Sequence, residues 1–437
     1  MLFETISLII ILLISMIFCV LITKKTIGGS FWILSPPVVM LGYFLSVKFI
    51  AVVLIESDIQ RIRALAAHSF WFFGIVSGLL CLVILRAAKP VNMYRFKRLT
   101  CNKKIVYFFV ILGCLSVFIT FLFLGRVPLI IGISSLFDFG SDITMHEARR
   151  MNTLQHRAGD TFYFGQGYFR QIYAVVTPVF CAAFYLYCKS NNVNSFKKNI
   201  SKALLVLFVF FAALNGQIWI SAQMIVFFLL VAWYWKAKEA GNKFLLPIFK
   251  KGMAAYFGLL GFVFLYRYLQ YLQGRHFENF FLDTFRRIYS YSVSFLFEYF
   301  PDTEPFRLGA TWLNDLRGIL PGSIQSFSYE VHYLVHGGAW GFTLSPGIVA
   351  SSYVNFGYLG VLFTSMALTM VFTFFYIKMI DSQSSLKVAL AIYLSYRFAF
   401  GMPGDFSGFI VSLITCFLIL YAYIFLNSLS RLQFVSK

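Results

Sequence analysis

Long apolar runs separated by short polar segments dominate the chain. Runs near the ~20 residues that an α-helix needs to cross a bilayer recur eleven times in the 437-residue sequence. The pattern predicts an all-α polytopic membrane protein in which residues 1–437 form one membrane domain. We place the spans at residues 4–23, 31–55, 66–86, 105–125, 171–188, 203–216, 218–235, 252–269, 352–377, 387–401 and 407–428.

Two stretches leave the number of crossings open. The polar break Asn215-Gly216-Gln217 separates two short spans. Farther on, Ser345-Pro346-Gly347 precedes a short apolar stretch that ends at Asn355-Phe356-Gly357. Residues 344–356 are either a re-entrant half-helix or an extra crossing, and the second case raises the total to twelve. Non-helical backbone at membrane depth is tolerated only where it is buried in protein or lines a wet cavity.

Two polar stretches, 126–170 and 270–345, are too long to be simple connections. Loops of this length are usually functional or disordered, and the aromatic periodicity of the second argues against disorder. Its apolar residues at helical spacing predict an amphipathic helix at the membrane interface; they are Phe277, Phe280, Phe281, Phe285 and Ile288. We find no internal repeat, so the inverted-repeat design of many transporters gains no support.

The distribution of positive charge predicts the orientation of the spans. The net charge is +20, but the basic residues flank apolar runs and do not line one polar face, so the bilayer, and not nucleic acid, is the expected partner. Lysine-rich connections such as Lys197-Lys198 mark the cytoplasmic side. The first span has Glu4 before it and Lys24-Lys25 after it, the reverse of a signal peptide. We therefore expect an uncleaved span, an outer N-terminus and a cytoplasmic C-terminus.

Lysine and arginine are sorted along the chain. Residues 105–188 and 252–377 contain no lysine, yet they hold eleven of the eighteen arginines, balanced by almost equal numbers of acids. These arginines therefore either pair locally or recognise an anion, for which the planar guanidinium is suited. The candidate substrate-binding residues are loop arginines, the arginine Arg397 near the outer end of a late span, and the loop tyrosine Tyr333, which could stack on a sugar. The loop arginines are Arg149, Arg150, Arg157, Arg170, Arg287 and Arg317.

Histidine and cysteine usage narrows the chemistry. All seven cysteines fall in apolar spans or basic loops, so we expect neither structural disulfides nor a thiolate metal site. In the segment that begins at Glu330, His332 and His336 are four residues apart and would share a helix face. The spacing differs from the metalloprotease pattern, and we predict no metal. Glu330, His332 or His336 is instead a general base or a contact to an acceptor sugar, unless these residues only cap helices and satisfy loop backbone.

The stretch from Pro321-Gly322-Ser323 to Gly360 carries a family resemblance. It contains Gly337-Gly338, then Ser345-Pro346, then Tyr353-Val354-Asn355-Phe356-Gly357-Tyr358-Leu359-Gly360. This order resembles the O-antigen or oligosaccharide repeat-unit polymerases of the Wzy type. The run from Gly125 to Leu129, the pair Arg149 and Arg150, and the spacing of Arg307 and Gly318 are similar to that family as well.

The resemblance implies a metal-independent and cofactor-free glycosyltransferase of the bacterial inner membrane. Such an enzyme joins undecaprenyl-diphosphate-linked oligosaccharides into surface polysaccharide at the outer leaflet, with a chain-length-regulating co-polymerase as a candidate partner. Arg149, Arg150 and Arg307 would then contact the diphosphate side, with Arg157, Arg170 and Arg287 in reserve, and Glu330, His332 or His336 would be the base. Two alternatives stay open: the related O-antigen ligase, and a lipid-linked oligosaccharide flippase or other transporter.

Overall fold

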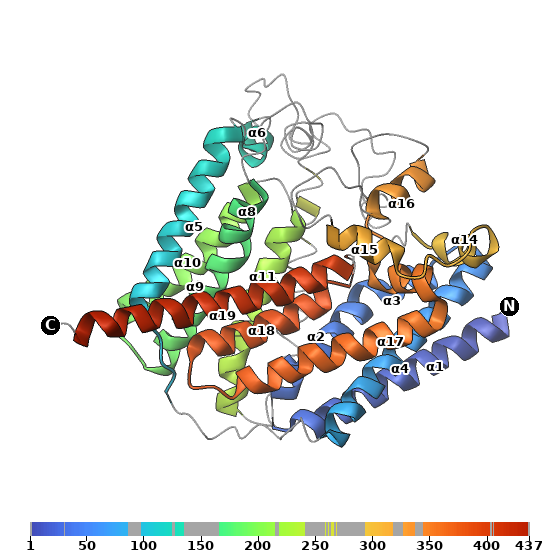
Figure 1. The fold of residues 1–437 in the computed structure, drawn as a ribbon, viewed down its shortest axis with the longest axis horizontal. Helices are drawn as coiled ribbons and strands as arrows, with labels where there is room; N and C mark the ends of the chain where they lie inside the picture. The colour runs from blue at the N-terminus through green and yellow to red at the C-terminus, as the bar shows by residue number, and fades with distance from the viewer. Residues whose placement is uncertain are drawn as a thin grey trace. The chain divides into compact units, whose positions relative to one another are not determined.

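The computed structural model describes residues 2–29, 31–85, 98–124, 127–134, 166–214, 218–240, 293–317, 327–336, 344–402, 404 and 406–435, with residues 258, 261, 264, 265 and 268 (Figure 1). Apart from one bridge between Thr100 and Ser384, all regular structure in these ranges is helical. The chain is thus an all-α polytopic membrane protein, as its pattern predicts. It divides into two compact units: unit 1 is Met1–Met93, Arg286–Asp381 and Leu394–Ile414, and unit 2 is Tyr94–Phe285, Ser382–Tyr393 and Thr415–Lys437.

Eight helical segments of the described chain are long and apolar enough to cross a membrane. Each corresponds to one predicted span, although several extend farther. They are Phe3–Ile27, Pro36–Val53, Asp58–Ile84, Lys103–Leu122, Phe169–Ser190, Ile220–Lys238, Gly347–Ile380 and Phe406–Ser428. The third begins at Asp58, well before the predicted residue 66, where Ser57 is the N-cap and its hydroxyl accepts from the Gln60 amide.

Two further predicted spans are helical but are not among the eight segments that are long and apolar enough to cross a membrane. The span at 203–216 lies largely in α10 (Ser195–Leu214), which opens with several lysines, and the span at 387–401 lies in α18 (Ser385–Phe400), which has 16 residues. Of the eleventh span, 252–269, only isolated residues fall within the described ranges. The break at 215–217 and the amphipathic stretch 277–288 lie outside them.

Unit 1 is organised around two long helices, α4 (Asp58–Ile84) and α17 (Gly347–Ile380), with α1 (Leu2–Ile27) packed on α4. Helices α4 and α17 approach closely at Gly78, where an added Cβ would lie 2.7 Å from the Met366 carbonyl oxygen. Gly74 meets Ser365 one turn earlier. This spacing of glycines four apart is a small-residue motif that lets membrane helices pack backbone to backbone.

The second span is interrupted. It is built from α2 (Pro36–Tyr43), a π-helical turn η2 (Phe44–Lys48) and α3 (Phe49–Val53), preceded by the short 3-10 helix η1 (Phe31–Leu34). The buried Phe44 ring packs against Phe72 of α4, with ring centroids 5.2 Å apart. The aromatic contact holds the irregular turn against the core of unit 1.

Helix α17 is broken at Phe356 and Gly357. Phe356 has φ −143° and ψ 19°, and Gly357 has φ 63°, a backbone conformation that favours glycine. The part that follows the break, through Ile380, is ~35 Å long at 1.5 Å per residue, which suffices for a crossing. The residues before the break therefore form a separate half-helix of about 13 Å, too short for the extra crossing that the sequence left open.

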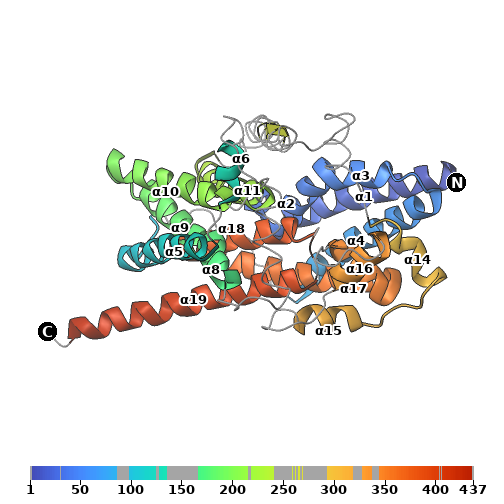
Figure 2. The same cartoon turned by 90° about the horizontal axis from the view of Figure 1, so that it is seen from above.

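Three short helices gather at the end of unit 1 where α4 and α17 begin (Figures 1 and 2): α14 (Leu296–Asp302), α15 (Ala310–Arg317) and α16 (Phe327–His336). Helix α14 is tied to α4 by an ion pair of 2.9 Å between Arg63 and Asp302. Gln60 donates to Glu298 at 2.8 Å. The described part of the long stretch 270–345 is thus largely helical and anchored to the membrane helices of its own unit.

Unit 2 has its own core. Helix α5 (Lys103–Leu124) packs against the segment formed by α8 (Gln166–Gln171), the π-helical η4 (Ile172–Val176) and α9 (Thr177–Ser190), and α10 and α11 (Ile218–Ala240) complete the set. The short α6 (Pro128–Ser134) follows α5, and α19 (Phe406–Val435) ends the chain. The Phe109 and Phe180 rings stack at 4.0 Å.

All seven cysteines have free thiols.

Candidate functional site

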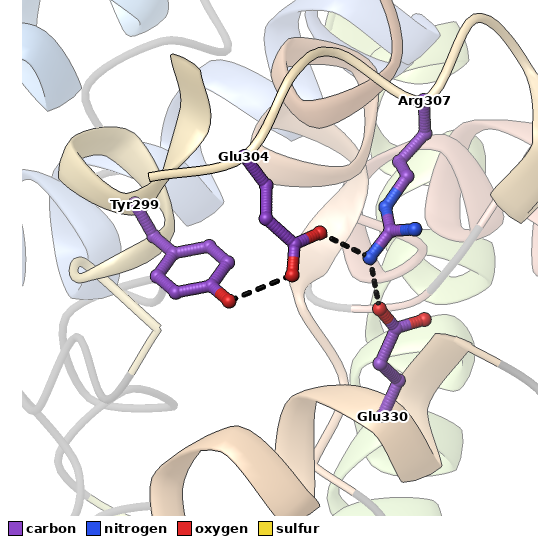
Figure 3. A network of polar contacts seen from close by, with 4 residues as sticks. All are labelled: Tyr299, Glu304, Arg307 and Glu330. Atoms are coloured by element: carbon purple, nitrogen blue, oxygen red, sulfur yellow. Dashed lines mark hydrogen bonds and ion pairs between the residues drawn. The ribbon is translucent and has the colours of Figure 1, made fainter. Parts of the chain in front are cut away.

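Four polar side chains of unit 1 form a connected network (Figure 3). Nη2 of Arg307 donates to Glu304 and to Glu330, at 2.6 Å in both cases. The Tyr299 hydroxyl donates to the other oxygen of Glu304 at 2.8 Å. Two of these residues, Arg307 and Glu330, are among the candidates that the sequence offers, and they come together from segments 23 residues apart.

The backbone around Arg307 is docked on the broken end of the half-helix in α17. The Arg307 amide donates to the Val354 carbonyl and the Leu308 amide to the Asn355 carbonyl, both at 3.0 Å. The last carbonyls of a helix lack partners within the helix, so the break in α17 exposes the acceptors that this segment uses. The break therefore provides the hydrogen-bond acceptors that hold the backbone of Arg307 in place.

Asn355 locks the same segment with its side chain. Its Oδ1 accepts from the Gly309 amide at 2.9 Å, and its Nδ2 donates to the Thr311 hydroxyl at 2.6 Å and to the Ser351 carbonyl at 2.8 Å. Asn355 is fully buried. One turn before it on α17, the Ser351 hydroxyl accepts from the Trp312 indole N–H at 3.1 Å, which holds α15 beside the half-helix.

Glu330 is positioned by α16, whose first turn is capped from α15. The buried Asp315 accepts from the amide of Phe327, the first residue of α16, at 3.0 Å. A carboxylate at a helix N-terminus satisfies an otherwise unpaired amide and is favoured by the helix dipole. Val331, fully buried, fixes the rotation of α16. These contacts orient the adjacent Glu330 toward Arg307.

The electrostatics of the network follow from its two carboxylates and one guanidinium. Burial raises the pKa of Glu330 above its ordinary value, Arg307 opposes this effect, and the negative charge of Glu304 adds to it. The hydrogen bond to Glu304 raises the pKa of Tyr299. Within the described chain, Nη1 of Arg307 and Oε2 of Glu330 have no hydrogen-bond partner, and Nε of Arg307 is buried without one. Among the described residues, the site thus leaves one oxygen of Glu330 and two nitrogens of Arg307 without hydrogen-bond partners.

No family model, curated protein or solved structure matches this chain. Among the described residues, no group of three or more His, Cys, Asp or Glu side chains is arranged to hold a metal ion.

The other candidates on α16 have different surroundings. His332 is half-buried and is not among the hydrogen-bond partners of Arg307, and Tyr333 is 62% exposed. The side chain of His336 lies outside the described part of the chain. Among the described side chains of α16, Glu330 is the one that bonds to the arginine.

The remaining candidate arginines that the structure describes are not part of the network. Arg317 is exposed at the end of α15, and Arg397 on α18 donates to the Ser412 hydroxyl at 2.8 Å and lies over the Tyr396 ring. Arg170 belongs to α8 of unit 2. The residues that lie outside the described ranges are Arg149, Arg150, Arg157 and Arg287.

The structure adds residues that the sequence did not single out as functional. Glu304 entered only the balance of acids and arginines, although its position three residues before Arg307 is compatible with pairing. The sequence marks Asn355 as part of the end of a possible half-helix and of the family-like pattern, but it assigns the residue no role. The hydrogen bonds of Asn355 to Gly309 and Thr311 depend on the break in α17 that follows it. The signal in the sequence was an asparagine directly before Phe-Gly in an apolar run, since a polar side chain buried there needs hydrogen-bond partners.

Proposed function

We propose that this protein is a membrane glycosyltransferase that polymerises undecaprenyl-diphosphate-linked oligosaccharide repeat units at the outer leaflet of the bacterial inner membrane. The observation that supports it best is the paired Arg307 and Glu330 with their open donor and acceptor, at the end of unit 1 where α4 and α17 begin. The site lies at the end of α4 and α17, two helices long and apolar enough to cross a membrane, which suits a lipid-linked substrate. The resemblance of residues 321–360 to repeat-unit polymerases points the same way.

In the proposed reaction, Glu330 is the general base. It accepts the proton of a hydroxyl on the newly arrived repeat unit while that oxygen attacks the anomeric carbon of the growing chain. The bond from this carbon to the lipid diphosphate breaks, and the diphosphate leaves with the electron pair. A carboxyl group with a raised pKa is a better base than an ordinary one, and burial supplies this for Glu330.

The leaving diphosphate needs positive charge, which arginine provides through strong charge-assisted hydrogen bonds. We assign this role to arginines of the lysine-free stretches, Arg149 and Arg150 first, with Arg157, Arg170 and Arg287 as further candidates. No nucleotide sugar is needed, because the diphosphate linkage already activates the donor.

The test is polymerisation in proteoliposomes that contain only the purified protein and lipid-linked repeat units. We expect a ladder of lengthened glycans without nucleotide sugar or added metal. Glu330→Gln should slow lengthening by about 100-fold or more, the usual range for a lost general base. Arg307→Lys should also slow lengthening, because lysine lacks the planar guanidinium that bonds to both acids. Arg98→Lys is its matched control, because Arg98 is exposed and belongs to unit 2.

Other outcomes separate the competing functions. Leaflet exchange of the lipid without new glycosidic bonds identifies a flippase. Transfer of preformed glycan to a lipid A core, with no ladder, identifies a ligase. Wild-type rates of lengthening in Glu330→Gln refute the assignment of the base, even if the polymerase activity stands.

A further inference from the structure

We infer that the network of Tyr299, Glu304, Arg307 and Glu330 binds a hydroxyl of the acceptor sugar and not the lipid diphosphate. The inference deepens the proposed function and rests on it, because it decides which of the two substrates this site takes. It also changes the role expected for Arg307, which the sequence alone suggested as a diphosphate ligand.

The charge of the network disfavours a diphosphate. The network contains two carboxylates and one guanidinium, and Arg307 is hydrogen-bonded to both acids through the same nitrogen. With both acids ionised, its net charge is −1. A diphosphate carries only negative charge and hydrogen-bond acceptors, so its oxygens would face the open Oε2 of Glu330, which is also an acceptor. An anion placed here would be repelled.

The unpaired atoms of the network complement a hydroxyl group. A sugar hydroxyl both donates and accepts. Within the described chain, Oε2 of Glu330 is an acceptor without a partner, and Nη1 of Arg307 is, besides the buried Nε, a donor without one. Figure 3 shows both atoms on the same side of the ion pair. One hydroxyl can therefore accept from Arg307 while it donates its proton to Glu330, which is also the geometry of general-base activation.

An aromatic side chain lies beside the network. Tyr333 is three residues after Glu330 on α16, so the two side chains lie on one helix face. Its ring is 62% exposed. An exposed ring beside a carboxylate is suited to a sugar, whose apolar face stacks on aromatic carbon while its hydroxyls reach the acid. The site thus offers Tyr333 for the apolar face of a sugar and Glu330 for its hydroxyls.

Binding measured with two separate probes tests the inference. The purified full-length protein in nanodiscs is titrated with the lipid-free repeat-unit oligosaccharide, released from its lipid by mild acid, and separately with undecaprenyl diphosphate. We expect Glu330→Gln and Arg307→Lys to weaken oligosaccharide binding at least tenfold. Binding of undecaprenyl diphosphate should change less than twofold, or tighten in Glu330→Gln because a negative charge is removed.

The control is Asn314→Ala on the exposed side of α15, which should leave both affinities unchanged. The inference is overturned if Arg307→Lys weakens undecaprenyl diphosphate binding tenfold, or if the wild-type protein does not bind the oligosaccharide. Polymerisation is measured separately. Absence of a ladder with wild-type protein would therefore refute the proposed polymerase without deciding which probe this network binds.

Discussion

Replacing Asn355 by alanine should release the segment that carries Arg307. Three consecutive amides, those of Arg307, Leu308 and Gly309, donate to the broken end of the half-helix in α17, although the segment itself is not helical. Asn355→Ala removes the acceptor of the Gly309 amide and the donor to Thr311. The backbone bonds to Val354 and to the carbonyl of residue 355 remain possible.

The size of the effect follows from these two lost bonds. A net hydrogen bond contributes ~1 kcal/mol, and an amide left partly buried without a partner costs ~1–2 kcal/mol. The docked segment should lose about 2–3 kcal/mol, and since every 1.4 kcal/mol is a factor of ten, opening should become roughly 30- to 150-fold more frequent. Polymer lengthening should fall with it, because Arg307 is then held in place for less of the time.

Amide hydrogen exchange of the protein in detergent measures this directly. Peptides that cover residues 304–312 should exchange faster in Asn355→Ala by about that factor, while peptides from the second half of α17 stay protected. Asn314→Ala, an exposed asparagine on α15, is the matched control and should show wild-type exchange. Unchanged exchange across 304–312 in the Asn355 variant would refute the argument that the break in α17 seats the arginine.

Three further outcomes are expected. The rate of lengthening should fall as the pH drops through the raised pKa of Glu330, because the base is then protonated. Glu304→Gln should move this fall in rate to lower pH, since the negative charge of Glu304 helps to raise the pKa of Glu330. A pH-rate profile that does not move in this variant contradicts the assignment of Glu330 as the base. Gly78→Ala should lower the midpoint of thermal unfolding, because the added Cβ would meet the backbone of α17. The control Gly42→Ala has open space at the added Cβ and should leave the midpoint unchanged or raise it. Equal midpoints for the two variants would be inconsistent with close packing of α4 on α17. Asp315→Ala should reduce stability by ~1 kcal/mol through loss of the cap on α16, measured by the same unfolding assay, and no loss would show that the cap is dispensable.

The sequence by itself determined the class of protein and most of its membrane helices. A run of apolar residues can satisfy its backbone in a bilayer only as a helix or in a closed barrel, and the lengths of the runs here fit helices. For this reason the predicted spans and the eight described segments agree closely. Boundaries at polar ends were not predicted: α4 begins at Asp58, before the predicted residue 66, and the polar residues of its first turns include Arg63, which pairs with Asp302 of α14.

The site depended on the tertiary structure. Sequence patterns nominated Arg307 and Glu330 separately, but nothing in their spacing showed that both reach the same point, or that Glu304 shares the arginine. That arrangement needs the break at Gly357, which frees the carbonyls of Val354 and Asn355 to bind the segment of Arg307. Hydrophobic periodicity is a local property and could suggest a half-helix, whereas the partners of its exposed end come from residues far away in the chain, and only folding brings them together.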